Sequence, residues 1–234
     1  MSSLSLNELK ILTSNSSRTV LDGLAPAFER ASGRRYAVEF DSAKSMLARI
    51  ESGETGDIVI LGAAVVHDLE KRGTVRPGSR RLFALSRVGV AVRSGAPKPD
   101  ISTVDAFRRA LLDARSIAHT VHGASGMYVP VLLERLGIAE QMKPKTITRP
   151  GGYIGSVVAS GEAEIAVQQI VELRAVPGID IVGPLPDEIQ KVFETAVGVF
   201  TASTRPGAAE ELIRFLLAPA AARVFEEVGL EQGR

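Results

Sequence analysis

Residues 10–61 read KILTSNSSRTVLDGLAPAFERASGRRYAVEFDSAKSMLARIESGETGDIVIL. Three short apolar runs, at residues 9–13, 36–40 and 57–61, alternate in this part of the chain with two segments whose apolar side chains recur every three to four residues. That spacing predicts an amphipathic helix in each intervening segment. Strands that alternate with helices are typical of a parallel sheet, because a parallel connection needs a crossover. The stretch therefore predicts an α/β fold.

The same alternation continues to the C-terminus. We expect further strands at residues 82–92, 117–119, 146–148, 164–167, 179–182 and 191–201, and further helices at residues 64–72, 102–112, 126–136, from 153 onwards, 205–217 and 220–228.

Two segments of the chain have similar sequences. Residues 49–54 (RIESGE) lead into DIVI at 57–60, and residues 158–162 (VASGE) lead into EIAV at 164–167. Each is the end of a helix, a glycine, an acidic loop and a buried strand. This similarity predicts two similarly built α/β lobes. It does not indicate a solenoid, because a solenoid would repeat every 20–50 residues. We place lobe 1 at residues 1–84 and 197–234 and lobe 2 at residues 85–196.

Composition and charge exclude several classes of protein. The chain has 234 residues, with 28 basic and 27 acidic side chains, so it lacks the basic excess of a dedicated nucleic-acid binder. It has no cysteine, which excludes disulfides, thiol catalysis and zinc–thiolate sites. No run approaches 18 apolar residues, so no membrane span is predicted. Residues 1–7 lack the basic and apolar regions of a secretory signal. We therefore expect a cytoplasmic protein as the chain stands, and a periplasmic one if a signal peptide has been removed.

Four turns rich in small residues precede predicted helices. They are TSNSS at 13–17, DSAKS at 41–45, GASG at 123–126 and PGGY at 150–153. The N-terminus of a helix carries unpaired N–H groups and partial positive charge, and small residues let an anion approach them. Each turn alone is also compatible with plain helix capping. Four turns in equivalent positions, at the carboxyl ends of strands, favour a shared anion site in a cleft, with two turns from each lobe.

The opening stretch resembles that of the molybdate-binding periplasmic proteins, which belong to the type II solute-binding superfamily of ABC transporters. That family has an IEAG…AD segment before a strand. The pieces of this chain that resemble the family after the first strands are IESG at 50–53, GD at 56–57, GMY at 126–128, residues 161–167 and LLAPAA at 216–221. The resemblance implies the type II periplasmic-binding-protein fold, in which two α/β lobes close on a ligand in the cleft between them. It implies an ABC transporter as partner, and no cofactor.

The resemblance also implies a set of ligand contacts. The family's first Ser falls on Ser16 and its third-turn donor on Ser125. At Ala43 and Gln168 this chain departs from the family, whose contacts there are a Ser and a Tyr. The expected ligand-binding residues are Ser14, Ser16, Ser17, Ser42, Ala43, Lys44, Ser125, Gly126, Gly151, Gly152, Tyr153 and Gln168.

Lys44 stands where the family has a small neutral residue. A full cation at a helix N-terminus suits a carboxylate or polycarboxylate better than a small tetrahedral anion. Arg18 and Arg149 border other turns and are candidates for the same role. For all three, the alternative is an ordinary solvated side chain.

The spacing of the histidines does not indicate a metal site. HTVH at residues 119–122 lacks a third ligand nearby, so no metal site is predicted. His122 is either a general acid or base, a common role of histidine in catalysis, or a loop-capping residue. His67 lies in a predicted helix and is interpreted as structural or exposed. The chain has no G-x-x-x-x-G-K-[ST] loop and no nucleophile elbow.

Two functions are consistent with these features. One is a solute-binding protein for a small anion, either an oxyanion such as molybdate or a carboxylate, that serves an ABC transporter or a sensor. The other is a cytoplasmic isomerase similar to aconitate isomerase. Such an enzyme would move a proton across the allylic system of a tricarboxylate, with Lys44 or His122 as the proton carrier.

Overall fold

The computed structural model describes residues 8–233, which form two compact units. Unit 1 runs to Leu85 and resumes at Glu194, and unit 2 is Ser86–Phe193. Both boundaries fall inside long strands, β4 and β9, so each of these strands contributes residues to both units. The fold is mixed α/β, as the alternation of elements predicts.

The sheet of unit 1 has the strand order β2-β1-β3-β9-β4, with β10 paired to β4. β1 is parallel to β2 and β3, whereas β9 is antiparallel to β3. The strands are β1 (Glu8–Ser14), β2 (Arg35–Asp41), β3 (Ile58–Gly62), β4 (Arg81–Arg93), β9 (Val192–Val199) and β10 (Leu230–Gln232). Parallel pairing of the first three strands confirms the crossover order read from residues 10–61.

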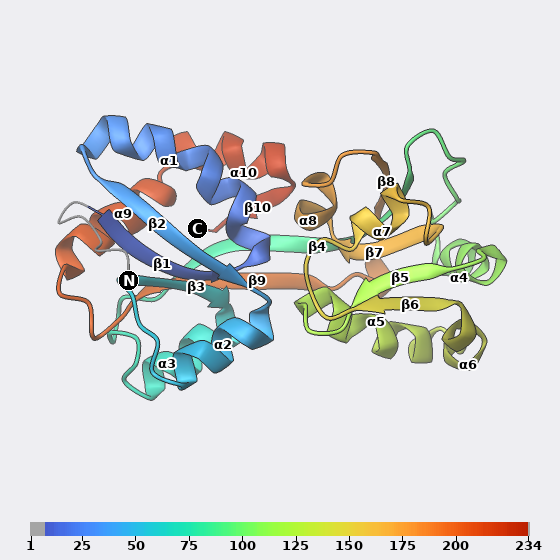
Figure 1. Cartoon of the computed structure of the whole chain (residues 1–234), viewed down its shortest axis with the longest axis horizontal. Helices are drawn as coiled ribbons and strands as arrows, with labels where there is room; N and C mark the ends of the chain where they lie inside the picture. Colours follow the sequence, from blue (N-terminus) through green and yellow to red (C-terminus); the bar gives the residue numbers. More distant parts are fainter. Residues whose placement is uncertain (1–7, 234) are drawn as a thin grey trace. The chain divides into compact units, whose positions relative to one another are not determined.

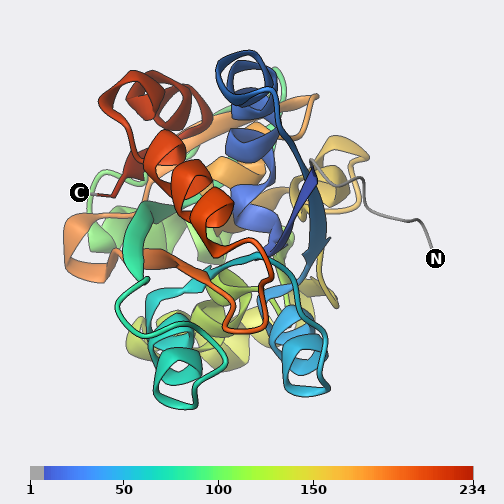
Figure 2. The same ribbon diagram turned by 90° about the vertical axis from the view of Figure 1, so that its left-hand side faces the viewer.

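Helices cover both faces of the unit 1 sheet (Figures 1 and 2). One face carries α1 (Arg18–Ser32), α9 (Pro206–Leu216) and α10 (Ala222–Val228), and the other carries α2 (Ala43–Glu51) and α3 (Ala63–Lys71). The predicted apolar side of α1 is buried, and its Phe28 stacks edge-on against Phe215 of α9. Apolar burial on both faces explains why β3 is almost wholly apolar in sequence.

Asp57, in the segment GD at 56–57, is a structural residue. Its carboxylate accepts hydrogen bonds from the backbone N–H of Lys10 at 2.9 Å, from Ser203 Oγ at 2.7 Å and from Arg205 Nη2 at 2.8 Å. These bonds connect β1 to the segment that leads into α9. Asp57 therefore stabilises unit 1.

The sheet of unit 2 has the order β4-β7-β5-β6, with β8 paired to β4. β5 is parallel to β6 and β7, and β4 is antiparallel to β7. The further elements of this unit are β5 (Ile117–Thr120), β6 (Thr146–Arg149), β7 (Ile165–Gln169), β8 (Ile179–Pro184), α4 (Val104–Asp113), α5 (Ala124–Arg135), α6 (Ala139–Met142), α7 (Gly155–Ala159) and α8 (Ile170–Arg174).

Two apolar clusters fill unit 2, one on each face of its sheet. Val90 and Val92 of β4 pack with Phe107 of α4 and Leu132 of α5, whereas Ala91, between the two valines, belongs to the cluster with α7 and α8. Large side chains on one face and small ones on the other allow the short helices α7 and α8 to approach the sheet closely.

The sequence-based element boundaries were wrong in several places. α5 begins at Ala124 and not at 126, so the predicted third turn is already the first turn of a helix. The cap of α4 is Thr103, whose Oγ1 accepts from the Ala106 N–H, and not Ser102. The helix expected from Tyr153 onwards begins at Gly155 and has one turn. α6, α8 and β10 were not predicted, because elements of three to five residues are too short to show a periodicity.

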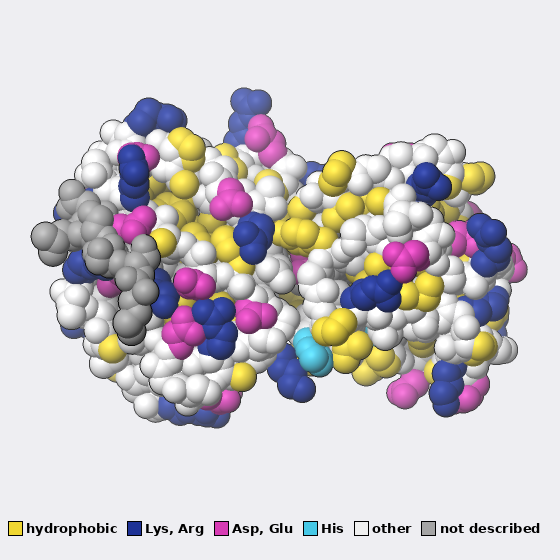
Figure 3. Space-filling model, in the orientation of Figure 1, with side chains coloured by type: hydrophobic (Ala, Val, Ile, Leu, Met, Phe, Trp, Pro, Cys, Tyr) yellow, Lys and Arg dark blue, Asp and Glu magenta, His cyan; other side chains and the backbone are white. Residues whose placement is uncertain are grey.

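Basic and acidic side chains are interspersed on the face shown in Figure 3, in keeping with the near balance of the sequence. Within residues 8–233, no helix has the length and apolarity needed to cross a bilayer. The expectation about a secretory signal concerns residues 1–7, which lie outside the described residues.

Candidate functional site

The first predicted turn follows β1 and is buried. Ser14, Ser16 and Ser17 are only 8, 6 and 2% exposed. The Oγ atoms of Ser14 and Ser16 lie 3.0 Å apart, so one hydroxyl donates to the other. The hydroxyl that accepts this bond keeps its own hydrogen, which is available to a ligand.

The second turn follows β2 at the same edge of the sheet, since Ser14 pairs with Asp41 at the ends of the two parallel strands. Ser42 caps α2: its Oγ accepts from the Ser45 N–H at 3.2 Å and donates to the Ser45 hydroxyl at 2.8 Å. Ala43 begins the helix and offers only its backbone, and the Lys44 side chain is exposed. The structure thus gives Ser42 a capping role.

Arg18 brings a cation to this edge of unit 1. Its guanidinium lies over the ring of Phe40, 3.8 Å from the ring centroid. Phe40 is one residue before the end of β2, and Arg18 is the first residue of α1. The aromatic ring holds the guanidinium near the first and second turns through a cation–π interaction.

The third turn holds two hydroxyls that have no partner among the described residues. Ser125, in the first turn of α5, and Thr120, the last residue of β5, are 0 and 1% exposed, and both hydroxyl oxygens are buried without a hydrogen bond. The N-cap residue of α5, Gly123, provides no side-chain cap. Buried hydroxyls in proteins are normally paired, so two unpaired ones beside an uncapped helix N-terminus mark this place as unusual.

Two glycines let α5 begin against the end of β5. A β-carbon at Gly126 would overlap the backbone carbonyl of Thr120, and one at Gly123 would lie 2.6 Å from Thr120 Oγ1. The small residues of GASG therefore serve a close approach of helix and strand. That approach brings the Thr120 hydroxyl to the N-terminus of α5.

The side chain of Gln168 forms hydrogen bonds with the backbone of the fourth turn. This side chain, 1% exposed on β7, accepts the N–H of Ile154 at 2.9 Å and donates to the carbonyl of Gly152 at 2.8 Å. Gly152 has a φ of +85°, a left-handed conformation that favours glycine. Gly151 and Tyr153 flank it, and both are partly buried. Gln168, expected as a ligand contact, is thus bonded to the protein.

Arg149, at the end of β6, forms an ion pair with Glu162, with Nη2 and Oε2 2.6 Å apart. Its charge is therefore offset by a neighbouring carboxylate.

The histidines have separate environments. His119 is buried, its Nδ1 lies 2.8 Å from the Thr120 carbonyl oxygen, and burial lowers the pKa of its ring. His122 is partly exposed, and its backbone N–H donates to the Pro150 carbonyl, which joins the third and fourth turns. Within the described part of the chain, no three His, Cys, Asp or Glu side chains are grouped as a metal site would require.

The predicted site residues divide between the two units. Unit 1 holds Ser14, Ser16, Ser17, Ser42, Ala43 and Lys44, and unit 2 holds Ser125, Gly126, Gly151, Gly152, Tyr153, Gln168 and His122. Sequence reasoning missed Thr120, although a Thr between a buried strand and a glycine-rich turn was a usable signal. The buried carboxyl group of Glu172, in the unpredicted helix α8, was not singled out from the sequence either.

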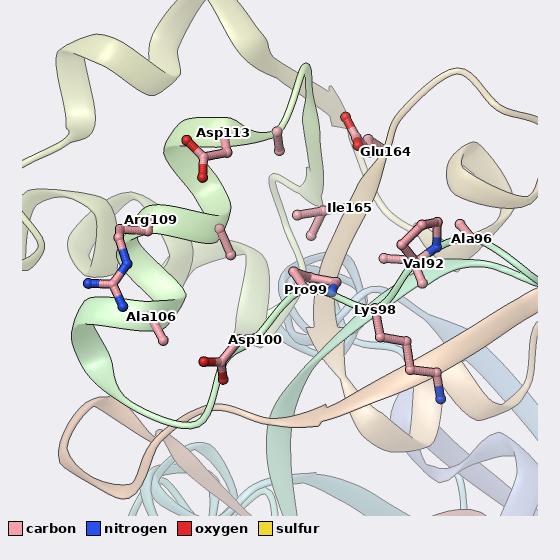
Figure 4. Close-up of a pocket in the computed structure, with 13 residues that line it drawn as sticks. Val92, Ala96, Lys98, Pro99, Asp100, Ala106, Arg109, Asp113, Glu164 and Ile165 are labelled. Atoms are coloured by element: carbon pink, nitrogen blue, oxygen red, sulfur yellow. The ribbon is translucent and has the colours of Figure 1, made fainter.

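Unit 2 also has a pocket of about 420 Å³ beside α4 (Figure 4). Apolar side chains line much of it, and charges of both signs surround them: Lys98, Asp100, Arg109, Asp113 and Glu164. The pocket lies where β5 and β7 begin, whereas the third turn follows the end of β5. Mixed charge gives this pocket no preference for anions.

A sequence profile of bacterial extracellular solute-binding proteins matches residues 9–231, nearly the whole chain. The chain belongs to the bacterial extracellular solute-binding protein family. This solute-binding protein is 35% identical over 229 residues to an aconitate isomerase from Pseudomonas sp, covering 95% of this chain and 87% of that relative.

Solved structures show the same fold at lower identity. The periplasmic molybdate-binding protein of Azotobacter vinelandii superposes with a TM-score of 0.81 at 18% identity, over 97% of this chain and all of that one. The sulfate-binding protein of Mycobacterium tuberculosis H37Rv gives a TM-score of 0.73 at 17% identity, over 97% and 87% of the two chains. At such identities the likeness of this solute-binding protein to them concerns the fold.

Proposed function

We propose that this protein binds a small multivalent anion at the turns that follow its parallel strands, with the N-terminus of α5 as a principal contact. The observation that carries the proposal is the pair of buried, unpartnered hydroxyls of Thr120 and Ser125. An unpaired buried hydroxyl costs free energy, and an anionic oxygen would supply the missing acceptor for both. The free N–H groups of α5 would add donors to the same oxygen.

Cations at the unit 1 turns favour a ligand with more than one carboxylate. Lys44 is exposed at the start of α2, and Arg18 is held over Phe40. We infer that these two charges and the Ser14–Ser16 hydroxyl pair bind anionic groups as well. The relatives' names support both a polycarboxylate and an oxyanion, because one relative is an aconitate isomerase and the structural neighbours bind molybdate or sulfate.

Ser125→Ala and Thr120→Val are expected to weaken anion binding tenfold to about a hundredfold each, because each removes a hydrogen bond to a charged group. Isothermal titration calorimetry with trans-aconitate, citrate, molybdate and sulfate measures the effect. Neither hydroxyl forms a hydrogen bond with another described residue of the protein. The melting temperature of each variant without ligand should therefore stay the same or rise.

Thr146→Val is the matched control. The Thr146 hydroxyl donates to the Met142 carbonyl at 2.8 Å, so this variant should lose stability and keep its affinity. Ser16→Ala and Lys44→Ala test the contribution of unit 1. Unchanged affinity in both Ser125→Ala and Thr120→Val would refute the α5 site.

A second function is favoured by the aconitate isomerase at 35% identity. In that reaction a base would take a proton from a carbon next to the double bond of an aconitate. The electron pair would spread over the allylic carboxylate system, and the proton would return to the far carbon, so that the double bond moves. Helix N-termini and cations would stabilise the negative charge in between.

Lys44 and His122 are the side chains proposed to carry that proton. We expect Lys44→Ala or His122→Ala to lower kcat by about a hundredfold or more while trans-aconitate still binds, because proton transfer contributes about 10²–10⁴ to such rates. Proton NMR of aconitate in D2O would show both the isomerisation and deuterium uptake at carbon. Binding of trans-aconitate without conversion would leave the protein as a solute-binding protein, with an ABC transporter as the proposed recipient of the anion.

A further inference from the structure

The segment at residues 71–81, which runs from the last residue of α3 to the first residue of β4, carries five basic side chains that the proposed anion site does not use. Two of them, Arg72 and Arg80, form ion pairs with glutamates, with N–O distances of 2.9 and 3.2 Å. Arg76 and Arg81 form no ion pair with any residue in the described part of the chain. The charge of these two guanidinium groups is therefore available to a ligand.

Arg76 and Arg81 line a pocket of about 250 Å³ in unit 1, which we call the arginine pocket. α9 contributes Glu210, Ile213 and Arg214 to it, which share one side of the helix because they are three and four residues apart. Arg214, like the other two arginines, has no ion pair within residues 8–233. Three arginines and one glutamate leave the arginine pocket with an excess of positive charge.

Hydrogen bonds fix the turn at residues 76–81 that presents two of these cations. Ser79 Oγ donates to the Arg76 carbonyl at 2.7 Å and accepts from the Val199 N–H at 3.1 Å. The Val199 carbonyl in turn accepts from the Arg76 N–H at 2.8 Å. The backbone beside Arg76 is thus joined to the end of β9, and the turn is ordered before any ligand binds.

The guanidinium group of Arg81 is itself held in place. Its Nη1 donates to the carbonyls of Gly78 and Arg80, at 2.8 Å in each case. These two bonds use both hydrogens of Nη1, whereas the hydrogens of Nε and Nη2 take no part in them. A guanidinium fixed in this way presents its other N–H groups in one orientation, so that little side-chain entropy is lost when a ligand binds.

The arginine pocket and the anion-binding turns lie at opposite ends of the unit 1 sheet. Ser79 bonds Val199, and Val199 pairs with Ile58, the first residue of β3. β3 is parallel to β1, so the arginine pocket is next to the end of the sheet where these strands begin. The first and second turns follow the ends of β1 and β2. A ligand in the arginine pocket is therefore separate from the anion of the proposed function.

The residues of the arginine pocket suit a phosphate group. A guanidinium binds phosphate through two parallel N–H donors, and a phosphate ester carries between one and two negative charges near neutral pH. Three arginines match the charge and the several acceptor oxygens of phosphate better than those of a single carboxylate. Pro77 and Ile213 add apolar surface beside the cations, which fits an organic group attached to the phosphate.

We propose that the arginine pocket is a second binding site of this protein, which takes a phosphate group carried by a small organic molecule or by a lipid head group. Arg76, Arg81 and Arg214 donate to the phosphate oxygens, and Glu210 limits the charge that the site accepts. Because the two sites lie at opposite ends of the sheet, the phosphate and the anion of the proposed function bind without competing.

Isothermal titration calorimetry with sodium pyrophosphate and with phenyl phosphate tests the site. Arg76→Gln and Arg214→Gln should each weaken binding about tenfold, because each removes charged donors. Glu210→Gln should strengthen binding about threefold, because it removes a carboxylate that repels phosphate. Arg72→Gln is the matched control: it removes a cation of the same segment that pairs with Glu51 outside the arginine pocket, and it should bind as the wild type does.

Sedimentation with phosphatidylcholine vesicles, with and without phosphatidic acid, distinguishes the two sources of phosphate. Pyrophosphate or phenyl phosphate binding that is lost in Arg76→Gln and Arg214→Gln identifies a soluble ligand. Sedimentation that needs phosphatidic acid and is lost in the same variants identifies a lipid head group. Equal binding in the wild type and in both variants, or no binding of any of these probes, would overturn the proposal.

The two sites can be told apart by their variants. Ser125→Ala should keep the arginine-dependent binding of pyrophosphate. Pyrophosphate binding that is lost in Ser125→Ala and unchanged in Arg76→Gln would assign the phosphate to α5 and overturn the arginine pocket, while it would support the proposed function. If trans-aconitate, citrate, molybdate and sulfate fail to bind and the arginine variants behave as expected, the proposed function fails and the arginine pocket stands.

Discussion

Gly126→Ala is expected to abolish anion binding and to lower the free energy of unfolding by about 3 kcal/mol, the upper end for overpacking. The added methyl group would overlap the carbonyl of Thr120, which is backbone at the end of a buried strand. The strand cannot move easily, because β5 lies between β6 and β7. The first turn of α5 must therefore shift, and its N–H groups and the Ser125 hydroxyl shift with it.

Thermal unfolding followed by circular dichroism measures the stability, with an expected fall of roughly 6–12 °C in Tm for a chain of this length. Gly207→Ala is the matched control, because Gly207 lies in α9, on the surface, and a β-carbon there would meet no atom within 4 Å. This control should be neutral or slightly stabilising. Full affinity in Gly126→Ala would mean that the start of α5 is not a contact for the anion.

Glu172→Gln is expected to stabilise the protein at alkaline pH by about 3–5 kcal/mol, an order-of-magnitude figure from the pKa shift. The pKa of Glu172 is raised from 4.5 to about 8 in the folded state. Below pH 4.5 the carboxyl group is protonated in both states and costs nothing. Between pH 4.5 and 8 only the unfolded state releases the proton, so wild-type stability falls as pH rises. Above pH 8 the folded state must bury the charge, and the penalty is complete.

Urea unfolding at pH 4, 6, 7 and 9 measures this effect. The difference in free energy of unfolding between the variant and the wild type should be near zero at pH 4 and should grow by about 1.4 kcal/mol per pH unit up to pH 8. A constant difference at all four pH values would show that Glu172 acts through its shape or hydrogen bonds and not through its charge.

The sequence predicted the elements that are long and periodic. α1 follows from the spacing of Val20, Leu24 and Phe28, and the parallel order of β1 to β3 follows from the crossovers between them. The anion-ready turns were predicted from small residues before helices, since helix N-termini need such residues whether they are capped or bind a ligand. Pattern alone cannot separate these two roles.

The hydrogen-bond partners in the folded chain distinguish a capping residue from one that is available to a ligand. Ser42 and Ser125 are both serines at the start of a helix, yet Ser42 bonds Ser45 and Ser125 bonds nothing among the described residues. Gln168 was expected as a ligand contact and Arg149 was a candidate for one; the structure bonds Gln168 to the fourth turn and pairs Arg149 with Glu162. The partners of Gln168 and Arg149 lie 13 to 16 residues away in the sequence, so local patterns do not reveal them.

The sequence by itself determined the α/β alternation, the family and the location of the small-residue turns, because local spacing and composition carry that information. Only the tertiary structure decided which hydroxyls have no partner among the described residues and which carboxyl group is buried there without a counter-charge. Burial depends on contacts between segments far apart in the chain, and in unit 2 it is burial that leaves the Thr120 and Ser125 hydroxyls free and keeps Glu172 neutral.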